Sequence, residues 1–277
     1  MNKKLFWIPA VVVFLAVFTG IYALYIEPNW LRVRKIDVQL PSEYAAQDGL
    51  TVLHLSDFQL RNPQIGWRER RVAALARQLD PDLVVVTGDV IEGYVSYQAW
   101  IDYVSALPSR YGVYAVAGNW EHWGDVNIWE MREDLANRGV SLLVNEIARV
   151  PVGERGHIEI LGLDNRTFQY QPFLAKLLEE SDPRLFRLLL VHAPVAFHQA
   201  ARGGIPLTLA GHTQGGQICL PFVGPLRRAV PGISGYFYGL YREKQSQMYV
   251  TSGVGTSTIP IRFFARPEVV LIRLKKD

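Results

Sequence analysis

Hydrophobic positions form one long run near the N-terminus and many short runs after it. The long run, Leu5 to Ile26, has no charged residue in 22 positions. As an α-helix it would extend roughly 33 Å, enough to cross a hydrocarbon core of about 30 Å. A cleaved signal peptide is the alternative, but its apolar region normally spans about 7–15 residues before a small-residue cleavage site. We therefore predict a retained transmembrane helix over about residues 5–26.

The charges that flank this helix are almost evenly divided between its two ends. Lys3 and Lys4 precede it, and Arg32, Arg34 and Lys35 follow it. The excess of basic residues that marks the cytoplasmic side is therefore nearly tied. Because a short N-terminal tail usually stays inside, we expect the rest of the chain on the extracytoplasmic side of the membrane.

After the anchor, short apolar runs typical of buried strands alternate with segments of helical spacing. The predicted strands are Val33–Leu40, Leu50–Leu55, Leu83–Thr87, Val113–Ala117, Ile158–Leu163, Phe186–Val191, Leu207–Ala210, Gln247–Thr251 and Glu268–Leu274. The predicted helices are Arg68–Leu79, Ser96–Leu107 and Asn127–Arg138, with Asp125 or Asn127 as the cap of the third. Strands alternating with helices predict a layered α/β core.

The length of the chain allows one well-packed domain beside the anchor. We therefore divide it into an anchor at residues 1–30 and a single domain at residues 31–277. The loop Pro221–Tyr241 is rich in glycine, proline and aromatic residues around the basic pair Arg227 and Arg228. Such a segment suits the headgroup boundary of a bilayer or a lipid phosphate. An ordinary loop packed on the sheet is the alternative.

Composition narrows the classes of partner. The formal net charge is +3, and without residues 1–26 the chain has 27 basic residues against 26 acidic ones. A nearly neutral domain gives no electrostatic reason to bind nucleic acid. Cys219 is the only cysteine, so no disulfide can form within the chain.

The most informative polar residues come where predicted strands end. Asp57, Asp89, Asn119, His192 and His212 each follow an apolar strand directly or within two residues. In open α/β sheets this edge is where ligands bind. Carboxylate, amide and imidazole ligands suit divalent ions such as Mn, Fe or Zn, and a bridging carboxylate can hold two of them. Singly, each residue has another interpretation, as a helix cap, a turn residue or a core histidine.

Five segments in order then carry a family resemblance. They are SDFQ (56–59), GDVIE (88–92), GNWEH (118–122), VHAP (191–194) and GHTQGGQ (211–217). These segments resemble the motifs of calcineurin-like metallophosphoesterases, closest to a membrane-associated bacterial branch with a GHTHGGQ-like segment. The resemblance covers roughly residues 33–275. It implies a four-layer α-β-β-α sandwich, and hydrolysis of a phosphate mono- or diester through attack of metal-bound hydroxide.

The resemblance also implies a role for each ligand. Asp89 would bridge two metal ions and Asp57 would bind the first. Asn119, His192 and His212 would bind the second. We expect one or two divalent ions per chain, with manganese first and magnesium, iron or zinc as alternatives. Asn119 and Asp89 are also expected to contribute to catalysis.

Three positions depart from the family pattern. Gln59 and Gln214 replace two histidines that would serve the first metal. With Asp57 and Asp89 they would form an all-oxygen site, which favours Mg, Mn or Ca over Zn. An empty first site is the alternative. At the third position, Trp120 replaces the histidine that normally donates a proton to the leaving group.

His122, two residues beyond Trp120, is a candidate substitute for the missing proton donor. A surface role for His122 is the alternative. Arg61 and Arg262 are candidate contacts for phosphate oxygens, although most single arginines are simply solvated.

These features favour a membrane-anchored, metal-dependent phosphoesterase whose phosphoester substrate is an amphiphile such as a lipid. One alternative is a non-catalytic metal-binding or scaffold protein that retains the fold after losing ligands. Another, by resemblance to some relatives, is an enzyme like the UDP-2,3-diacylglucosamine pyrophosphatase of lipid A synthesis.

Overall fold

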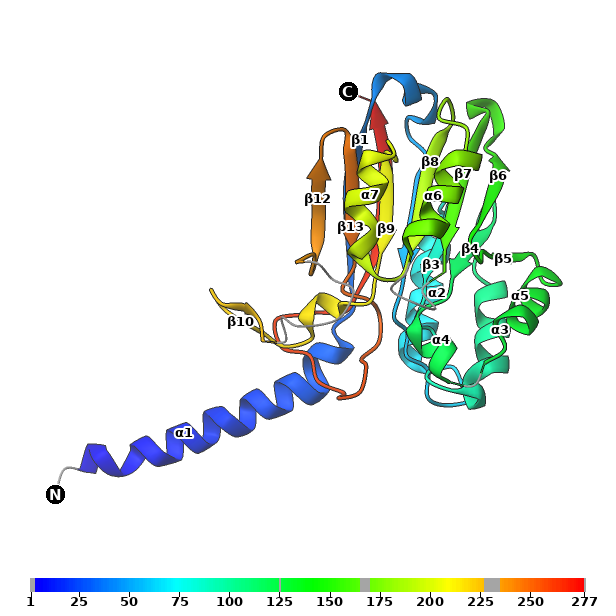
Figure 1. Cartoon of the computed structure of the whole chain (residues 1–277). Coiled ribbons are helices and arrows are strands. Elements are labelled where there is room, and N and C mark those ends of the chain that lie inside the picture. The colour runs from blue at the N-terminus through cyan, green and yellow to red at the C-terminus, as the bar shows by residue number, and fades with distance from the viewer. Residues whose placement is uncertain (1–2, 125, 165–169, 227–234, 277) are drawn as a thin grey trace.

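Two six-stranded sheets face each other in the computed structural model, which describes residues 3–124, 126–164, 170–226 and 235–276 (Figure 1). The first sheet has the order β1-β14-β2-β3-β4-β5. Its strands are β1 (Arg32–Leu40), β14 (Glu268–Lys276), β2 (Thr51–Leu55), β3 (Leu83–Thr87), β4 (Val113–Val116) and β5 (Val140–Leu142).

The second sheet has the order β12-β13-β9-β8-β7-β6. Its strands are β12 (Gly239–Glu243), β13 (Ser246–Val250), β9 (Leu207–Ala210), β8 (Phe186–Val191), β7 (His157–Leu163) and β6 (Glu146–Pro151). A small separate hairpin pairs β10 (Cys219–Leu220) with β11 (Gly224–Pro225).

Helices cover the outer face of each sheet. Those of the domain are α2 (Trp67–Leu79), α3 (Tyr97–Ser105), α4 (Asn119–Trp123), α5 (Ile128–Ala136), α6 (Gln171–Glu180) and α7 (Phe197–Arg202). One apolar cluster joins α2, α3 and α5 to the first sheet, and another joins α6 and α7 to the second. A third cluster fills the space between the sheets with residues from both. The predicted four-layer sandwich is therefore confirmed.

The nine predicted strands and three predicted helices of the domain are all present, with ends within two residues of those observed. The Asn127 side chain caps α5 by accepting from the backbone N–H groups of Trp129 and Glu130. Asp125, the other candidate cap, lies outside the described residues. Sequence reasoning did not identify β5, β6, β12, α6 or α7.

Parallel pairing brings the carboxyl ends of the central strands to one end of the sandwich. Strands β2, β3 and β4 are parallel in the first sheet, and β7, β8 and β9 are parallel in the second. The loops that follow these strands therefore converge from both sheets, which is the place where open α/β folds bind ligands.

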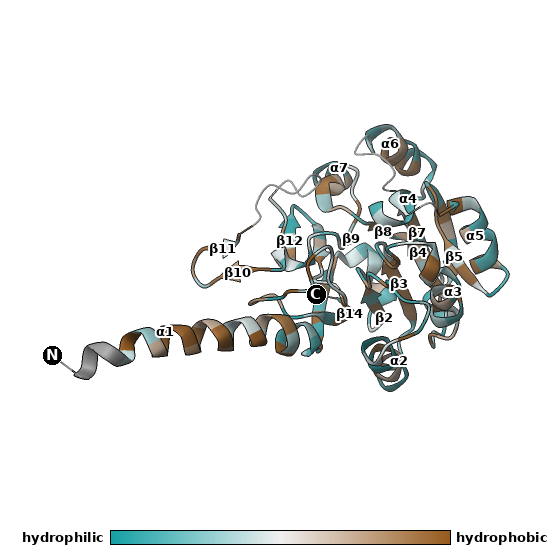
Figure 2. Cartoon of the chain, turned by 90° about the horizontal axis from the view of Figure 1, so that it is seen from below, coloured by the Kyte–Doolittle hydropathy of each residue, from teal (hydrophilic) through white to brown (hydrophobic). Residues whose placement is uncertain are grey.

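The N-terminal helix α1 (Lys3–Ile21) projects away from the sandwich (Figures 1 and 2). It continues as a π-helical turn over Tyr22–Ile26 and a 3-10 turn over Glu27–Asn29. The stretch Trp7–Asn29 has the length and apolar composition needed to cross a membrane, and little of it is buried against the domain.

Candidate metal centre

The polar residues predicted at strand ends meet at the carboxyl edge of the two sheets. Asp57 and Asp89 each lie two residues beyond a strand, β2 and β3, and Asn119 opens α4 after β4. His192 and His212 follow β8 and β9 in the second sheet. His212 is half-buried and the other four are buried. The site is therefore assembled from both sheets at the point where their central strands end.

Asp89 lies at the centre of this cluster. Its Oδ2 atom is 3.2 Å from His192 Nε2 and accepts a 3.1 Å hydrogen bond from Gln59 Nε2. Its Oδ1 atom accepts from the backbone N–H of Trp120 at 2.9 Å. His212 Nδ1 lies 3.1 Å from His192 Nε2. The ligand atoms of Asp89, His192 and His212 all lie within 4.8 Å of one another, a spacing that one metal ion can bridge.

The ring of His192 is oriented by the backbone behind it. Its Nδ1 atom is 2.6 Å from the carbonyl oxygen of Thr87. Because a carbonyl oxygen only accepts, Nδ1 carries the proton, and Nε2 faces Asp89 and His212. Metal-binding histidines are commonly held in this way, with one ring nitrogen donating to a carbonyl while the other coordinates.

Three buried oxygen atoms around Asp89 have no hydrogen-bond partner in the described part of the chain. They are Asp57 Oδ1, Gln59 Oε1 and Asn119 Oδ1. Leaving a buried polar atom unpaired costs roughly 1–3 kcal/mol, and more for a charged group. Three such acceptors beside two imidazoles form an incomplete set that a divalent cation would complete. The donors present therefore fit the metal ions that the sequence predicts.

The turns that carry these residues have unusual backbone conformations. Asp57, Gln59, Asp89, His212 and Gln214 all have positive φ, between 49° and 69°. This left-handed region is uncommon for residues other than glycine, and such strain concentrates at functional sites.

Two glycines of the motifs are required by close contacts. A Cβ atom on Gly211 would lie 2.5 Å from Asp57 Oδ2, and one on Gly118 would overlap the Asp89 carboxylate. Real Cβ atoms do not approach other atoms this closely. Each glycine therefore lets the backbone lie directly against a candidate ligand.

Glu121 is a site residue that sequence reasoning missed. Its buried carboxylate accepts from four backbone N–H groups, those of Asp89, Val90, Ile91 and Gly118. It therefore fixes the turn after β3, which holds Asp89, against the start of α4. The available signal was a glutamate three residues after Gly118, the spacing of a helix capping box.

The buried charged groups of the cluster shift one another's pKa values. Burial opposes protonation of His192, but the carboxylates of Asp89 and Asp57 outweigh it and raise the His192 pKa to about 9. Burial raises the pKa of Asp57 to about 6, and His192 partly offsets this. Burial also acts to raise the Asp89 pKa, yet His192 lowers it overall. Metal binding near neutral pH must therefore displace a proton held by this cluster.

The two glutamines that depart from the family pattern have different surroundings. Gln59 donates from Nε2 to Asp89, and its buried Oε1 has no hydrogen-bond partner among the described residues. Gln214 Oε1 instead accepts from the backbone N–H of Ser257 at 3.0 Å. Since a backbone N–H can only donate, that contact fixes the oxygen on Ser257. An amide oxygen has two lone pairs, so the oxygen-ligand role of Gln214 stays a prediction.

The remaining candidates lie around the cluster. His122 is not a surface residue, because its Nε2 atom lies 2.8 Å from Asp164 Oδ1 and its side chain is mostly buried. Arg61 is paired with the Glu92 carboxylate and donates to the carbonyl oxygen of Thr256 at 3.1 Å. The metal centre thus has a paired histidine and a paired arginine beside it.

Arg262 has a structural environment that does not suit a phosphate contact. Its side chain is fully buried, and Nε, Nη1 and Nη2 all donate to main-chain carbonyl oxygens. With its donors engaged, Arg262 stabilises the loop that follows β13. The prediction that Arg262 contacts phosphate oxygens is therefore wrong, because its side chain is buried and its donors are bonded to the main chain.

Comparison with known proteins agrees with this geometry. The family described as calcineurin-like phosphoesterase matches residues 50–222. The uncharacterized metallophosphoesterase YkuE of Bacillus subtilis is 30% identical over 257 residues, which are 92% of this chain and 89% of that protein.

A relative from Danio rerio and a solved structure are also similar to this chain. A transmembrane protein with metallophosphoesterase domain from Danio rerio is 32% identical over 94% of this chain. The match covers 62% of that longer protein. Among solved structures, the protein TT1561 of Thermus thermophilus superposes with a TM-score of 0.50 at 13% identity. That match covers 74% of this chain and 90% of that one, and it supports the fold.

Proposed function

This chain belongs to the calcineurin-like phosphoesterase family, and on that premise we propose that it is a membrane-anchored, manganese-dependent hydrolase of a phosphate mono- or diester carried by an amphiphile. The family establishes phosphoester hydrolysis as the reaction class. The amphiphilic substrate, the choice of manganese and the membrane location are our proposals, and each is supported by particular residues.

The observation that carries the proposal is the set of unpaired buried oxygens around Asp89. Asp57, Gln59 and Asn119 contribute the unpaired oxygens. Asp89, His192 and His212 contribute a carboxylate and two imidazoles whose ligand atoms lie within 4.8 Å of one another. Oxygen-rich ligands with some imidazole suit Mn²⁺. When bound, divalent ions supply Lewis-acid polarisation of the phosphoryl group and activation of the water nucleophile. The protein residues hold the ligand atoms and exclude bulk water.

We assign the general acid role to His122. It lies in α4 one turn beyond Asn119, and Asp164 fixes its ring through Nε2. Trp120 stands where the family usually has the proton donor, and its indole cannot supply a proton to an alkoxide. His122 is the nearest titratable side chain on the same helix that can do so.

Replacing His122 by alanine is expected to reduce turnover of esters with poor leaving groups by about 10²–10⁴-fold. Esters of p-nitrophenol should lose much less, because p-nitrophenolate leaves without protonation. The measurement is kcat for an alkyl and a p-nitrophenyl phosphodiester, with His198→Ala as the matched control, because His198 is an exposed histidine on α7. Equal losses for the two esters would show that His122 is not the acid.

The surface near the anchor supports the membrane location. The side chains of the β10–β11 hairpin with the largest exposed apolar surface are Phe222, Val223 and Leu226. The hairpin extends from the domain on the side where α1 leaves it (Figure 2). Bulky apolar side chains beside a membrane helix suit insertion at the headgroup boundary. Arg227 and Arg228, also expected to contact lipid, lie outside the described residues.

As part of the proposal we place the domain on the extracytoplasmic side, because the basic residues Lys3 and Lys4 at the start of α1 suit the cytoplasmic face. Cys219, the single cysteine, lies on the domain side of α1. Its labelling by an impermeant maleimide in intact cells would report that side, whereas labelling only after lysis would reverse the assignment.

The function is tested with the full chain in detergent after removal of metal by chelation. Hydrolysis of bis(p-nitrophenyl) phosphate should fall to the rate without protein and should return when Mn²⁺ is added. Equal hydrolysis with and without metal would overturn the mechanism. No hydrolysis of dye esters or lipid phosphoesters with Mn, Mg, Zn, Fe or Ca would favour the alternative of a metal-binding scaffold.

A further inference from the structure

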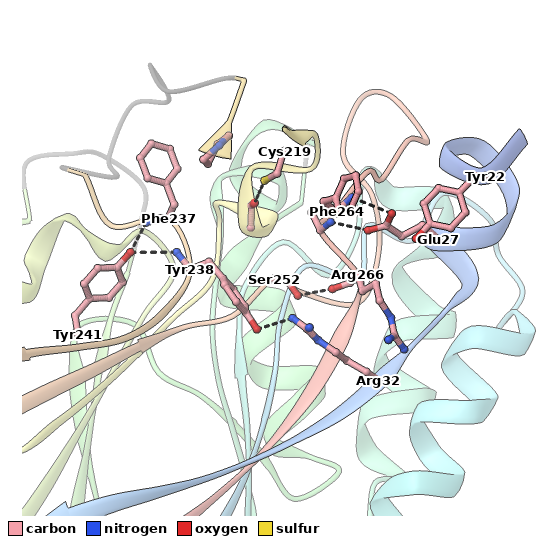
Figure 3. Close-up of a pocket in the computed structure, with 13 residues that line it drawn as sticks. Tyr22, Glu27, Arg32, Cys219, Phe237, Tyr238, Tyr241, Ser252, Phe264 and Arg266 are labelled. Atoms are coloured by element: carbon pink, nitrogen blue, oxygen red, sulfur yellow. Dashed lines mark hydrogen bonds between the residues drawn. The ribbon is translucent and has the colours of Figure 1, made fainter. Parts of the chain in front are cut away.

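A second site lies where the anchor meets the domain. A cavity of about 480 Å³ opens there, within the range of roughly 300–1,000 Å³ that is typical of small-molecule pockets. Tyr22 and Glu27 line it from the anchor, and Arg32, Phe237 and Arg266 are among the residues that line it from the domain (Figure 3). We call it the junction cavity.

The junction cavity is rigidly framed because the anchor is bonded to the domain. The carboxylate of Glu27 accepts from the backbone N–H groups of Phe264 and Ala265 at 2.9 and 2.6 Å. The carbonyl oxygen of Ala23 accepts from the N–H of Arg262 at 3.0 Å. Residues at the end of the predicted anchor are thus fixed to the loop before β14, and the cavity between them is preformed.

The walls of the cavity combine aromatic surface with cationic groups. Tyr22, Phe237, Tyr241 and Phe264 contribute rings. Arg32 also lines it, but its charge is paired with the buried Glu268 at 3.0 Å. Aromatic rings and a cation in one cavity are the features that an amphiphile with an anionic head requires.

Arg266 is the cation with spare hydrogen-bonding capacity. Its guanidinium stacks on the Trp30 ring, 3.9 Å from the centroid, and its Nε donates to the Trp30 carbonyl oxygen. Among the described residues, its two Nη groups have no hydrogen-bond partner. Glu27 also lines the cavity, but backbone N–H groups already engage both of its oxygens. An anionic headgroup could therefore accept hydrogen bonds from the Nη groups of Arg266 without displacing an existing contact.

The position of the cavity indicates where its ligand comes from. Tyr22 lies within the stretch Trp7–Asn29 that can cross a membrane. The exposed ring of Phe264 lies beside the cavity, and the apolar hairpin β10–β11 adjoins it through Cys219 and Pro225. A lipid of the bilayer can enter such a cavity without its chains crossing water.

We propose that the junction cavity binds one anionic phospholipid of the surrounding bilayer, with its phosphate on Arg266 and an acyl chain against the aromatic rings that line the cavity. The inference rests on the membrane location proposed above, but not on catalysis. Gly215 and Ser252 line the inner side of the cavity. They belong to the turns that carry Gln214 and that pack Gly253 against Asp57. The cavity therefore shares these turns with the residues of the metal centre.

Native mass spectrometry of the full chain tests this proposal. Released from detergent with phosphatidylglycerol, the protein should retain about one lipid molecule, and with phosphatidylcholine it should retain less. Arg266→Gln should weaken phosphatidylglycerol retention by at least about fivefold. Arg273→Gln is the matched control, because Arg273 is an exposed cation on β14, the strand that begins two residues after Arg266. Equal losses in both variants, or equal retention of the two lipids, would overturn the proposal.

Cys219 provides a second readout without any substitution. It is the only cysteine and it lines the junction cavity. Phosphatidylglycerol should slow its alkylation by a maleimide at least fivefold, and phosphatidylcholine should not. Alkylation that is insensitive to both lipids would overturn the proposal. Because neither measurement requires turnover, a negative result here leaves the test of metal-dependent hydrolysis unaffected.

Discussion

Replacing Asp89 with asparagine is expected to reduce phosphodiester hydrolysis by at least about 10³-fold at saturating Mn²⁺. Asp89 is the residue through which His192, Gln59 and Trp120 are connected. The substitution keeps the shape of the side chain but removes the negative charge that would hold two cations together. A bridging ligand that contributes about 4 kcal/mol to stabilisation of the transition state corresponds to a loss of about 10³-fold.

The hydrogen bonds around position 89 also make it difficult for the asparagine amide to replace the carboxylate as a metal ligand. One side-chain atom of residue 89 accepts from Trp120 N, and the other accepts from Gln59 Nε2. An asparagine NH₂ would face a donor at either position, so the ligand set would be disturbed as well as neutralised. Metal content of the purified variant, counted by mass spectrometry, should fall below that of the natural chain.

The matched control is Asp102→Asn, because Asp102 is an exposed carboxylate on α3 that pairs with Arg138. It should leave hydrolysis and metal content unchanged. An Asp89→Asn variant whose rate stays within tenfold of the natural chain would show that Asp89 does not bridge the metals. In the natural chain, a single tightly bound ion with no second under excess Mn²⁺ would rule out the two-metal centre and leave one occupied site.

The site residues that could be predicted from the sequence are those marked by the residues directly before them in the chain. Asp57, Asp89 and His192 each follow a buried apolar strand, and parallel strands bring such positions to one edge. The same short apolar runs predicted nine of the twelve strands in the two six-stranded sheets. The family motifs then assigned these positions to a metal centre, and the unpaired oxygens found in the structure fit that assignment.

The residues that it missed, or whose surroundings it did not foresee, depend on partners far along the chain. Gln214 is turned toward Ser257, which lies 43 residues later, and no pattern near Gln214 indicates this. Glu121 bonds the turn that holds Asp89, about 30 residues earlier. Glu27 bonds Phe264 and Ala265 across more than 230 residues, so the junction cavity has no signature in the sequence.

Replacing Arg262 with methionine is expected to destabilise the protein more than any surface substitution, by about 3 kcal/mol or more. Burial lowers the pKa of Arg262, which shows that its charge is costly to desolvate. That cost is already offset by strong hydrogen bonds to the carbonyl oxygens of Ser252, Gly255 and Ala265. Methionine removes the charge but leaves these carbonyls without a donor, at roughly 1–3 kcal/mol each.

Because the loss from several orphaned carbonyls exceeds the gain from removing one desolvated charge, the midpoint of thermal unfolding should fall by about 6–12 °C. Tryptophan fluorescence of the full chain in detergent measures it. Arg273→Met removes an exposed cation from β14 and should shift the midpoint by no more than about 2 °C. Arg262→Lys, which keeps the charge but offers fewer fixed donors, should be intermediate. Unchanged unfolding of Arg262→Met would show that the loop holding Ser252 and Gly255 is stable without the guanidinium.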